Sequence, residues 1–182
     1  GDVSMFFPSI DHEMLKKIIF RRVACQDTLN LINCIIDSAD SAQGLPIGNL
    51  TSQLWANVYL NDLDHFCKET LHIKLYLRYM DDFVIFHHDK AILQIILQEI
   101  GAFIENRLHL SLNDKTQIFP VGPRPVDFLG YRIWPDHRLL RKANVQRTKR
   151  KFKKFARLYA EGKMSMADIR PSIMSRLGHC KH

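Results

Sequence analysis

The sequence predicts a mixed α+β fold that continues into a helical C-terminal segment. The chain has 182 residues, of which 46% are hydrophobic and 25% charged, enough apolar material for a buried core. Two β-prone runs, Leu75–Tyr79 and Phe83–Phe86, flank Met80-Asp81-Asp82 and predict an antiparallel hairpin. Most other segments space their apolar residues at helical intervals, so we expect helices to pack on a small antiparallel sheet.

The first half of the chain is expected to hold one short strand, several helices and a loop rich in glycine and proline. In order, these elements are a strand over Asp2–Phe7, a helix from His12 to Val23 capped by Ser9 or Asp11, a helix over Thr28–Asp37, the loop Gln43–Asn49 and a helix from Thr51 or Ser52 to Thr70. The expected boundaries fall at residues that favour helix starts or turns.

The second half is expected to follow the hairpin with helices and short strands in alternation. In order, these are a helix capped by Asp89 that ends near Arg107, a strand over Thr116–Val121, a hairpin of Val126–Trp134 with Arg138–Leu140 around Pro135-Asp136, and helices over Asn144–Ala160 and Ser165–Leu177. We therefore expect residues 1–140 to form the main subdomain and residues 141–182 a basic helical one.

The composition excludes several classes of protein. No apolar run approaches the roughly 20 residues of a membrane-spanning helix, and the first residues show no secretory signal pattern. The cysteines are far apart and include no Cys-x-x-Cys pair, which argues against a zinc cage or a disulfide framework. We expect reduced thiols, a cytoplasmic location and no membrane partner.

Positive charge is concentrated towards the C-terminus. Nine of the seventeen residues from Arg141 to Arg157 are Lys or Arg and none is acidic, so the whole-chain charge of +7 leaves −2 for the rest. Phe152 and Phe155 are spaced to anchor one face of a helix here. Such a segment suits a phosphate backbone, although a solvated basic face explains the same pattern. The candidate nucleic-acid-binding residues are Arg141, Lys142, Arg147, Lys149, Arg150, Lys151, Lys153 and Lys154.

Two adjacent aspartates, Asp81 and Asp82, lie at the tip of the predicted hairpin. Turns favour aspartate, so a purely structural role is one explanation. Adjacent like charges repel, however, and Mg²⁺ relieves that repulsion because it prefers oxygen ligands. Asp2, on another predicted strand, would supply a third carboxylate. Such a set suits a pair of divalent ions that activate a 3′-hydroxyl and steady a leaving pyrophosphate.

Five motifs follow one another along the chain. They are Asp2-Val3-x-x-Phe6-Phe7, Gly44-Leu45-Pro46-Ile47-Gly48-Asn49-Leu50-Thr51-Ser52-Gln53, Tyr79-Met80-Asp81-Asp82, Leu112-Asn113-Asp114-Lys115-Thr116 and Phe128-Leu129-Gly130-Tyr131. In this order they resemble the palm and the start of the thumb of reverse transcriptases, over nearly the whole chain and most loosely beyond Arg141. The resemblance implies an α+β polymerase palm, with an antiparallel sheet backed by helices, followed by a helical thumb segment.

The resemblance implies a catalytic role for four of the matched residues. Asp2, Asp81 and Asp82 match the three catalytic carboxylates, and the backbone carbonyl of Val3 would be a further metal ligand. Lys115 matches the lysine that protonates or steadies the leaving pyrophosphate. The implied cofactors are two Mg²⁺ ions, with Mn²⁺ as a substitute.

The resemblance also implies contacts with the nucleotide and the primer. Phe7 matches the aromatic steric gate that excludes a ribose 2′-hydroxyl, although a core aromatic beside Phe6 is the alternative. Leu129-Gly130 matches the primer grip, and the basic segment matches a thumb helix that follows the primer–template backbone. The implied nucleotide-binding residues are Phe6, Phe7, Pro46, Ile47, Gly48 and Gln53.

Two departures from the family pattern change the expectation. Most reverse transcriptases carry Pro-Gln-Gly-x-x-x-Ser-Pro in the central motif, whereas this chain has Pro46-Ile47-Gly48-x-x-x-Ser52-Gln53. The pattern resembles the enzymes of diversity-generating retroelements and their group II intron-like bacterial relatives, which copy RNA with frequent errors, so we expect low fidelity. The fingers region that precedes Asp2 in the family is absent here, and we expect the chain alone to lack half of its nucleotide pocket and its activity.

The expected function is therefore an RNA-directed DNA polymerase of a bacterial retroelement. Its expected partners are an RNA template, a DNA primer and dNTPs, with a retroelement accessory protein as a further candidate. The alternatives are a non-catalytic nucleic-acid-binding scaffold and a phage-defence polymerase derived from a reverse transcriptase. Metal-dependent extension that Asp81→Ala abolishes would exclude the scaffold, and a requirement for a template would exclude the untemplated defence polymerase.

Overall fold

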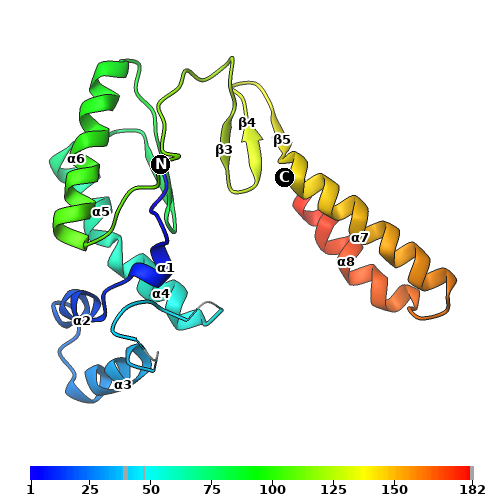
Figure 1. The fold of residues 1–182 in the computed structure, drawn as a ribbon, viewed down its shortest axis with the longest axis horizontal. Coiled ribbons are helices and arrows are strands. Elements are labelled where there is room, and N and C mark those ends of the chain that lie inside the picture. Colours follow the sequence, from blue (N-terminus) through cyan, green and yellow to red (C-terminus); the bar gives the residue numbers. More distant parts are fainter. Residues whose placement is uncertain (39–40, 47, 181–182) are drawn as a thin grey trace. The chain divides into compact units, whose positions relative to one another are not determined.

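The computed structural model describes residues 1–38, 41–46 and 48–180. For residues 179 and 180 it describes the backbone alone. The chain forms two compact units, Gly1–Ile118 and Phe119–His182, and the elements of each are labelled in Figure 1. The sequence predicts a division after residue 140, whereas the two units divide after Ile118. The reason is that β5 (Arg138–Leu140) pairs with β4 (Tyr131–Ile133), and the backbone N–H of Arg141 donates to the carbonyl of Gly130 at 2.9 Å.

The N-terminal segment of the first unit becomes helical sooner than the sequence predicts. Only Asp2 and Val3 pair as extended backbone, because Met5 adopts a left-handed conformation with φ 44° and starts α1 (Phe6–Ser9). The expected strand over Asp2–Phe7 is therefore wrong beyond Val3. Two further helices follow, α2 (His12–Phe20) and α3 (Gln26–Ile36). Asp11 caps α2, as predicted, by accepting a hydrogen bond from the backbone N–H of Met14 at 2.8 Å.

The long helix predicted after the glycine-rich loop is broken into three segments. These are α4 (Leu50–Tyr59), α5 (Asn61–His65) and the π-helical turn η1 (Phe66–Thr70). The break lies at Leu60, whose φ of −87° and ψ of 1° leave the helical range. Tyr59, just before the break, is fully buried, and its hydroxyl donates to the carbonyl of Leu108 at 2.7 Å. The break thus lets a buried ring tie α4 to the end of α6 (Lys90–Leu108).

The predicted hairpin is confirmed and its turn is shorter than expected. Strands β1 (Tyr76–Tyr79) and β2 (Asp82–Ile85) are antiparallel, and Tyr79 pairs with Asp82. Met80 and Asp81 alone therefore form the turn, and Met80 takes a left-handed conformation with φ 54°. Helix α6 begins after Asp89, whose side chain accepts from the backbone N–H of Ala91 at 2.7 Å, as the sequence predicts.

The core of the first unit lies where the N-terminal segment, the helices and the hairpin meet. Buried hydrophobic side chains come from all of them, and the most completely buried include Val3, Ile10, Leu15, Ile36, Leu60, Leu63, Ile100, Ile104 and Leu108. Phe83 of β2 is also buried, which fixes one face of the hairpin against this core. The catalytic candidates that precede Phe83 are thus attached to a packed element.

The second unit is a three-stranded meander followed by two helices (Figure 1). Strand β3 (Val126–Phe128) pairs with β4, which pairs with β5, and α7 (Lys142–Ala160) and α8 (Met166–Cys180) follow. The strand predicted over Thr116–Val121 does not form. Ser165 caps α8 together with Asp168 by reciprocal hydrogen bonds of 2.9 and 3.3 Å, which confirms the predicted capping box variant.

Among the residues that the structure describes, no helix combines the length and the apolar character that crossing a bilayer requires.

Candidate active site

The N-terminal residues lie between the hairpin and a segment that follows α6. On one side, Asp2 pairs with Asp82, and the backbone N–H of Val3 donates to the carbonyl of Asp81 at 3.3 Å. On the other side, Val3 pairs with Leu112, and the backbone N–H of Asn113 donates to the carbonyl of Asp2 at 2.8 Å. Backbone pairing thus brings the three predicted carboxylates to one end of the hairpin.

Asp81 is the carboxyl whose chemistry the surroundings alter most clearly. Partial burial raises its pKa above the ordinary value, and the charges of Asp2 and Asp82 and a hydrogen bond with Asp2 raise the pKa further. The Asp81 carboxyl therefore lies among like charges, to which Asp82 contributes from the start of β2. Such crowding fits a cation-binding site, because a divalent ion would offset the repulsion.

The structure does not assemble a complete set of metal ligands. In the described part of the chain, no three His, Cys, Asp or Glu side chains are grouped closely enough to hold a metal ion. The three aspartates are therefore neighbours through the paired backbone of Asp2, Val3, Asp81 and Asp82. Val3 is buried, and its backbone N–H donates to the carbonyl of Asp81. Carboxylate oxygens are the ligands that Mg²⁺ prefers. The three carboxylates, however, do not converge on one point.

Asn113 holds Asp2 in place, and sequence reasoning missed it. Its Nδ2 donates to Oδ2 of Asp2 at 2.9 Å, in addition to the backbone contact between the same residues. Its Oδ1 accepts from the backbone N–H of Lys115 at 3.0 Å, so one side chain links Asp2 to the segment that carries the predicted lysine. Lys115 itself is exposed. The only signal in the sequence is the position of this amide within the Leu112–Thr116 motif.

Arg78 fixes the turn that carries Asp81. Its Nη1 donates to the carbonyl of Met80 at 2.8 Å and to Oδ1 of Asn57 at 3.1 Å. Its Nε donates to Asp64 at 2.7 Å, and its Nη2 forms a second, short bond with the same carboxylate. The hydroxyl of Tyr76 also donates to Asp64, at 2.7 Å. Arg78 thus forms a salt bridge with the neighbouring Asp64 carboxylate.

The two adjacent phenylalanines have different environments. Phe6 is 2% exposed and belongs to the core, whereas Phe7 is half-buried. Their rings meet edge to face with centroids 5.5 Å apart. A nucleotide has almost no access to Phe6, because its ring is covered by core side chains, so we retain Phe7 alone as the gate candidate.

The remaining nucleotide-binding candidates lie around the glycine-rich loop. Pro46 and Gly48 are exposed, and Gly48 has a φ of 104°, which explains the glycine there. Gln53 is exposed in the first turn of α4. Ile47 lies outside the described residues. The backbone N–H of Leu45 donates to the carbonyl of Phe7 at 2.9 Å, so the loop and the gate candidate are neighbours.

The primer-grip candidates form a tight turn in the second unit. Leu129 and Gly130, with φ of 50° and 83°, connect β3 to β4, a turn that the sequence analysis placed inside a longer strand. A Cβ at Gly130 would lie 2.8 Å from Nδ2 of Asn144, at the start of α7. The positive φ favours glycine here, and a side chain at this position would displace the amide of Asn144.

The eight candidate nucleic-acid-binding residues lie on or just before α7, and all eight are exposed. Arg141 pairs with Asp127, its Nε and Nη2 lying 2.8 and 2.6 Å from Oδ1. Lys151 donates to Oγ of Ser172 at 3.1 Å, which links α7 to α8. These two residues have structural partners. The positive surface that the sequence predicts also includes the other six candidates, Lys142, Arg147, Lys149, Arg150, Lys153 and Lys154.

Comparisons with known proteins agree with this geometry. The family model described as reverse transcriptase (RNA-dependent DNA polymerase) matches residues 1–133. The chain is also similar to Protein YkfC of Escherichia coli (strain K12), with 28% identity over 73% of this chain and 45% of that protein. The chain thus spans less than half the length of this curated relative. The protein belongs to the reverse transcriptase family.

Proposed function

We propose that this chain contributes the catalytic centre of an RNA-directed DNA polymerase, which adds deoxynucleotides to the 3′-hydroxyl of a primer on an RNA template. The observation that carries the proposal is the backbone pairing that brings Asp2, Asp81 and Asp82 to one end of the hairpin, within the segment that the family model matches. Like-charged carboxylates in contact destabilise the protein unless a cation or a proton compensates them. That cost is expected where catalysis needs a metal.

The carboxylates Asp2 and Asp81, with Asp82 and the carbonyl of Val3, would hold two Mg²⁺ ions, with Mn²⁺ as a substitute. When bound, such ions supply the positive charge that lowers the pKa of the attacking hydroxyl and offsets charge on the leaving pyrophosphate. The protein's own contribution is positional. Asn113 holds Asp2 at 2.9 Å, and Arg78 holds the Met80 carbonyl at 2.8 Å. Fixed carboxylates need little reorganisation during the reaction.

Other residues would place the substrates. Phe7 would exclude a 2′-hydroxyl, Lys115 would meet the pyrophosphate, and the Leu129-Gly130 turn would contact the primer end. The exposed lysines and arginines of α7 would follow the backbone of the duplex. The presence of isoleucine in place of glutamine at Ile47 supports low fidelity and an origin in a bacterial retroelement, because its side chain cannot hydrogen-bond near the nucleotide. An unchanged error spectrum in Ile47→Gln would remove this residue from the explanation.

Primer extension on an RNA template with Mg²⁺ tests the proposal, using this chain and the full-length protein that its gene encodes. We expect extension that Asp81→Asn abolishes and Asp136→Asn preserves, because Asp136 is an exposed turn residue of the second unit. Extension that survives Asp81→Asn would contradict the proposed centre. No extension by any version, together with tight binding of duplex, would favour the non-catalytic scaffold.

A further inference from the structure

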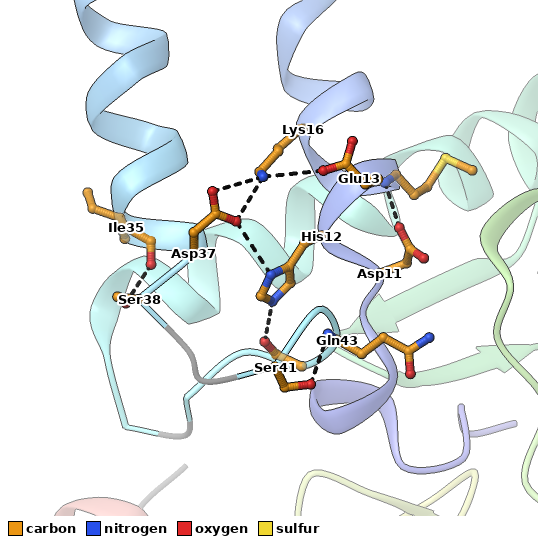
Figure 2. A network of polar contacts seen from close by, with 11 residues as sticks. Asp11, His12, Glu13, Lys16, Ile35, Asp37, Ser38, Ser41 and Gln43 are labelled. Carbon is orange, nitrogen blue, oxygen red and sulfur yellow. Dashed lines mark hydrogen bonds and ion pairs between the residues drawn. The ribbon is translucent and has the colours of Figure 1, made fainter.

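His12 is a buried polar residue that the proposed chemistry does not use. It lies in the first turn of α2 and is only 3% exposed. Its Nε2 lies 2.7 Å from the carbonyl oxygen of Gly44, in the glycine-rich loop (Figure 2). A carbonyl oxygen can only accept, so Nε2 must carry the hydrogen and donate it. The neutral Nε2–H tautomer and the protonated ring both provide this donor.

The other ring nitrogen makes a weaker contact. Nδ1 of His12 lies 3.7 Å from Oδ1 of Asp37, beyond hydrogen-bond distance. Asp37 is engaged by Lys16, whose Nζ lies 2.8 Å from Oδ1 and also reaches Glu13 at 3.3 Å (Figure 2). The ion pairs thus join α2 to the end of α3, while the short bond of the imidazole is directed at the loop.

The loop segment that His12 contacts lies against α1 and the residue that follows it. The backbone N–H of Gly44 donates to Ile10 at 2.8 Å, and that of Leu45 donates to Phe7 at 2.9 Å. Gly44 has a φ of 92°, and a Cβ there would lie 3.1 Å from the carbonyl oxygen of Pro8. The two backbones are therefore as close as a glycine permits, and the imidazole bond lies beside this contact.

We propose that His12 is a positioning residue, which holds the Gly44 carbonyl so that the loop through Pro46 stays against Phe7. The proposal rests on the proposed function, in which Phe7 excludes a 2′-hydroxyl, and on Pro46 of the loop as a nucleotide-binding candidate. The loop reaches Phe7 through its backbone carbonyl, so we expect a loosened loop to widen the space open to a nucleotide beside Phe7. His12 thereby acts on dNTP affinity and on the discrimination between deoxy- and ribonucleotides, although it touches neither substrate.

Three variants separate this role from a general contribution to stability. His12→Phe removes the donor and keeps a ring, whereas His12→Gln keeps an N–H that can reach Gly44. Tyr59→Phe is the matched control, since it removes another buried hydrogen bond, 2.7 Å long, to Leu108 at the end of α6. His12→Asn, with a shorter amide, replaces His12→Phe if that variant fails to fold.

The first readout is amide hydrogen exchange at Gly44 and Leu45, which needs no activity. We expect His12→Phe to speed exchange there about tenfold, the effect of removing one hydrogen bond from a buried acceptor, and His12→Gln to restore much of the protection. Tyr59→Phe should leave these amides unchanged. Equal exchange in His12→Phe and the wild type would overturn the proposal.

The second readout is steady-state extension with dNTP and rNTP by the full-length protein that the gene encodes. We expect His12→Phe to raise the KM for dNTP several-fold with a smaller change in kcat, and to lower the preference for dNTP over rNTP. An unchanged preference, with faster exchange, would overturn the link to sugar selection. If the wild type extends no primer, the proposed function fails, whereas the exchange result still decides whether His12 anchors the loop.

Discussion

Arg78 donates from Nη1 to the backbone carbonyl of Met80, 2.8 Å away, and so links the turn before Asp81 to Asp64 of α5. The Asp64 carboxylate is partly buried, with the side chain of Arg78 only 9% exposed. The same guanidinium reaches Asn57 of α4. One residue thus connects two helices to the hairpin turn, and the left-handed conformation of Met80 is held by contacts outside the turn.

We expect Arg78→Lys to reduce both stability and turnover. Arginine donates from three nitrogen atoms, whereas lysine has a single ammonium nitrogen. Lysine therefore cannot make the paired contacts with Asp64 and also reach the carbonyl of Met80. The loss should be about 2 kcal/mol in unfolding free energy, below that of a fully buried ion pair because Asp64 is partly exposed. Urea unfolding measures the stability and primer extension the kcat.

The control for Arg78 is Arg21→Lys, which alters the 3.8 Å pair between Arg21 and Asp62. Arg21 is 63% exposed, so this substitution should change stability by less than about 0.5 kcal/mol. Equal effects of the two substitutions would show that Arg78 is an ordinary surface cation. A stability loss without a change in kcat would show that the turn keeps its position without Arg78.

Asp81→Asn is expected to stabilise the folded protein near neutral pH while it abolishes extension. Burial and the charge of Asp2 raise the pKa of Asp81, so the folded state binds a proton more tightly than the unfolded state. Stability contributed by this group therefore falls as pH rises from the ordinary aspartate pKa through the raised folded value. An uncharged amide avoids this loss.

The measurement for Asp81 is urea unfolding of the wild type and Asp81→Asn at neutral pH and at a pH below the ordinary aspartate pKa. The variant should be more stable at neutral pH, and the difference should shrink in acid. Asp168→Asn should behave in the opposite way, since the pKa of Asp168 is lowered by its bonds with Ser165. A destabilised Asp81→Asn variant at neutral pH would show that the carboxylate has a structural partner.

Much of the first unit could be predicted from the sequence because its signals are local. Asp11 and Asp89 cap helices in the way their positions indicate, and the hairpin follows from two β-prone runs. The sequence predicts the adjacent aspartates and Asp2 on neighbouring strands, and the backbone of Asp2 pairs with that of Asp82. These features depend on residue type and short spacing, which a single sequence contains.

The missed features depend on contacts between distant residues. The turn at Met5 ends the predicted strand, since Phe6 must enter the core, and the break at Leu60 lets Tyr59 reach Leu108. The bonds of His12 to Gly44 and of Asn113 to Asp2 join residues separated by 32 and 111 positions. Periodicity carries no information on such pairs.

Asn113→Ala should lower kcat for primer extension about 10- to 100-fold, the usual effect of removing a group that orients a metal ligand. The Asp2 carboxylate would lose its 2.9 Å bond to Nδ2 and gain freedom to rotate. Asn113→Asp should be worse, because it adds a like charge beside Asp2 and Asp81. Asn30→Asp on the exposed side of α3 is the control for added charge. An Asn113→Ala variant with wild-type kcat would contradict the orienting role.

Replacing Lys149 and Lys153 together by glutamine should weaken duplex binding and make it less sensitive to salt. Both side chains are exposed one helical turn apart on α7, so they would face the same stretch of backbone. For each phosphate that is no longer neutralised, the slope of log K against log salt should become shallower by about 0.7–0.9. Fluorescence anisotropy with a labelled RNA–DNA hybrid over a salt series measures it. Lys163→Gln, outside α7 and paired with Glu161 at 2.8 Å, should leave the slope unchanged. If the double variant keeps the wild-type slope, α7 carries a solvated basic face and the duplex binds elsewhere.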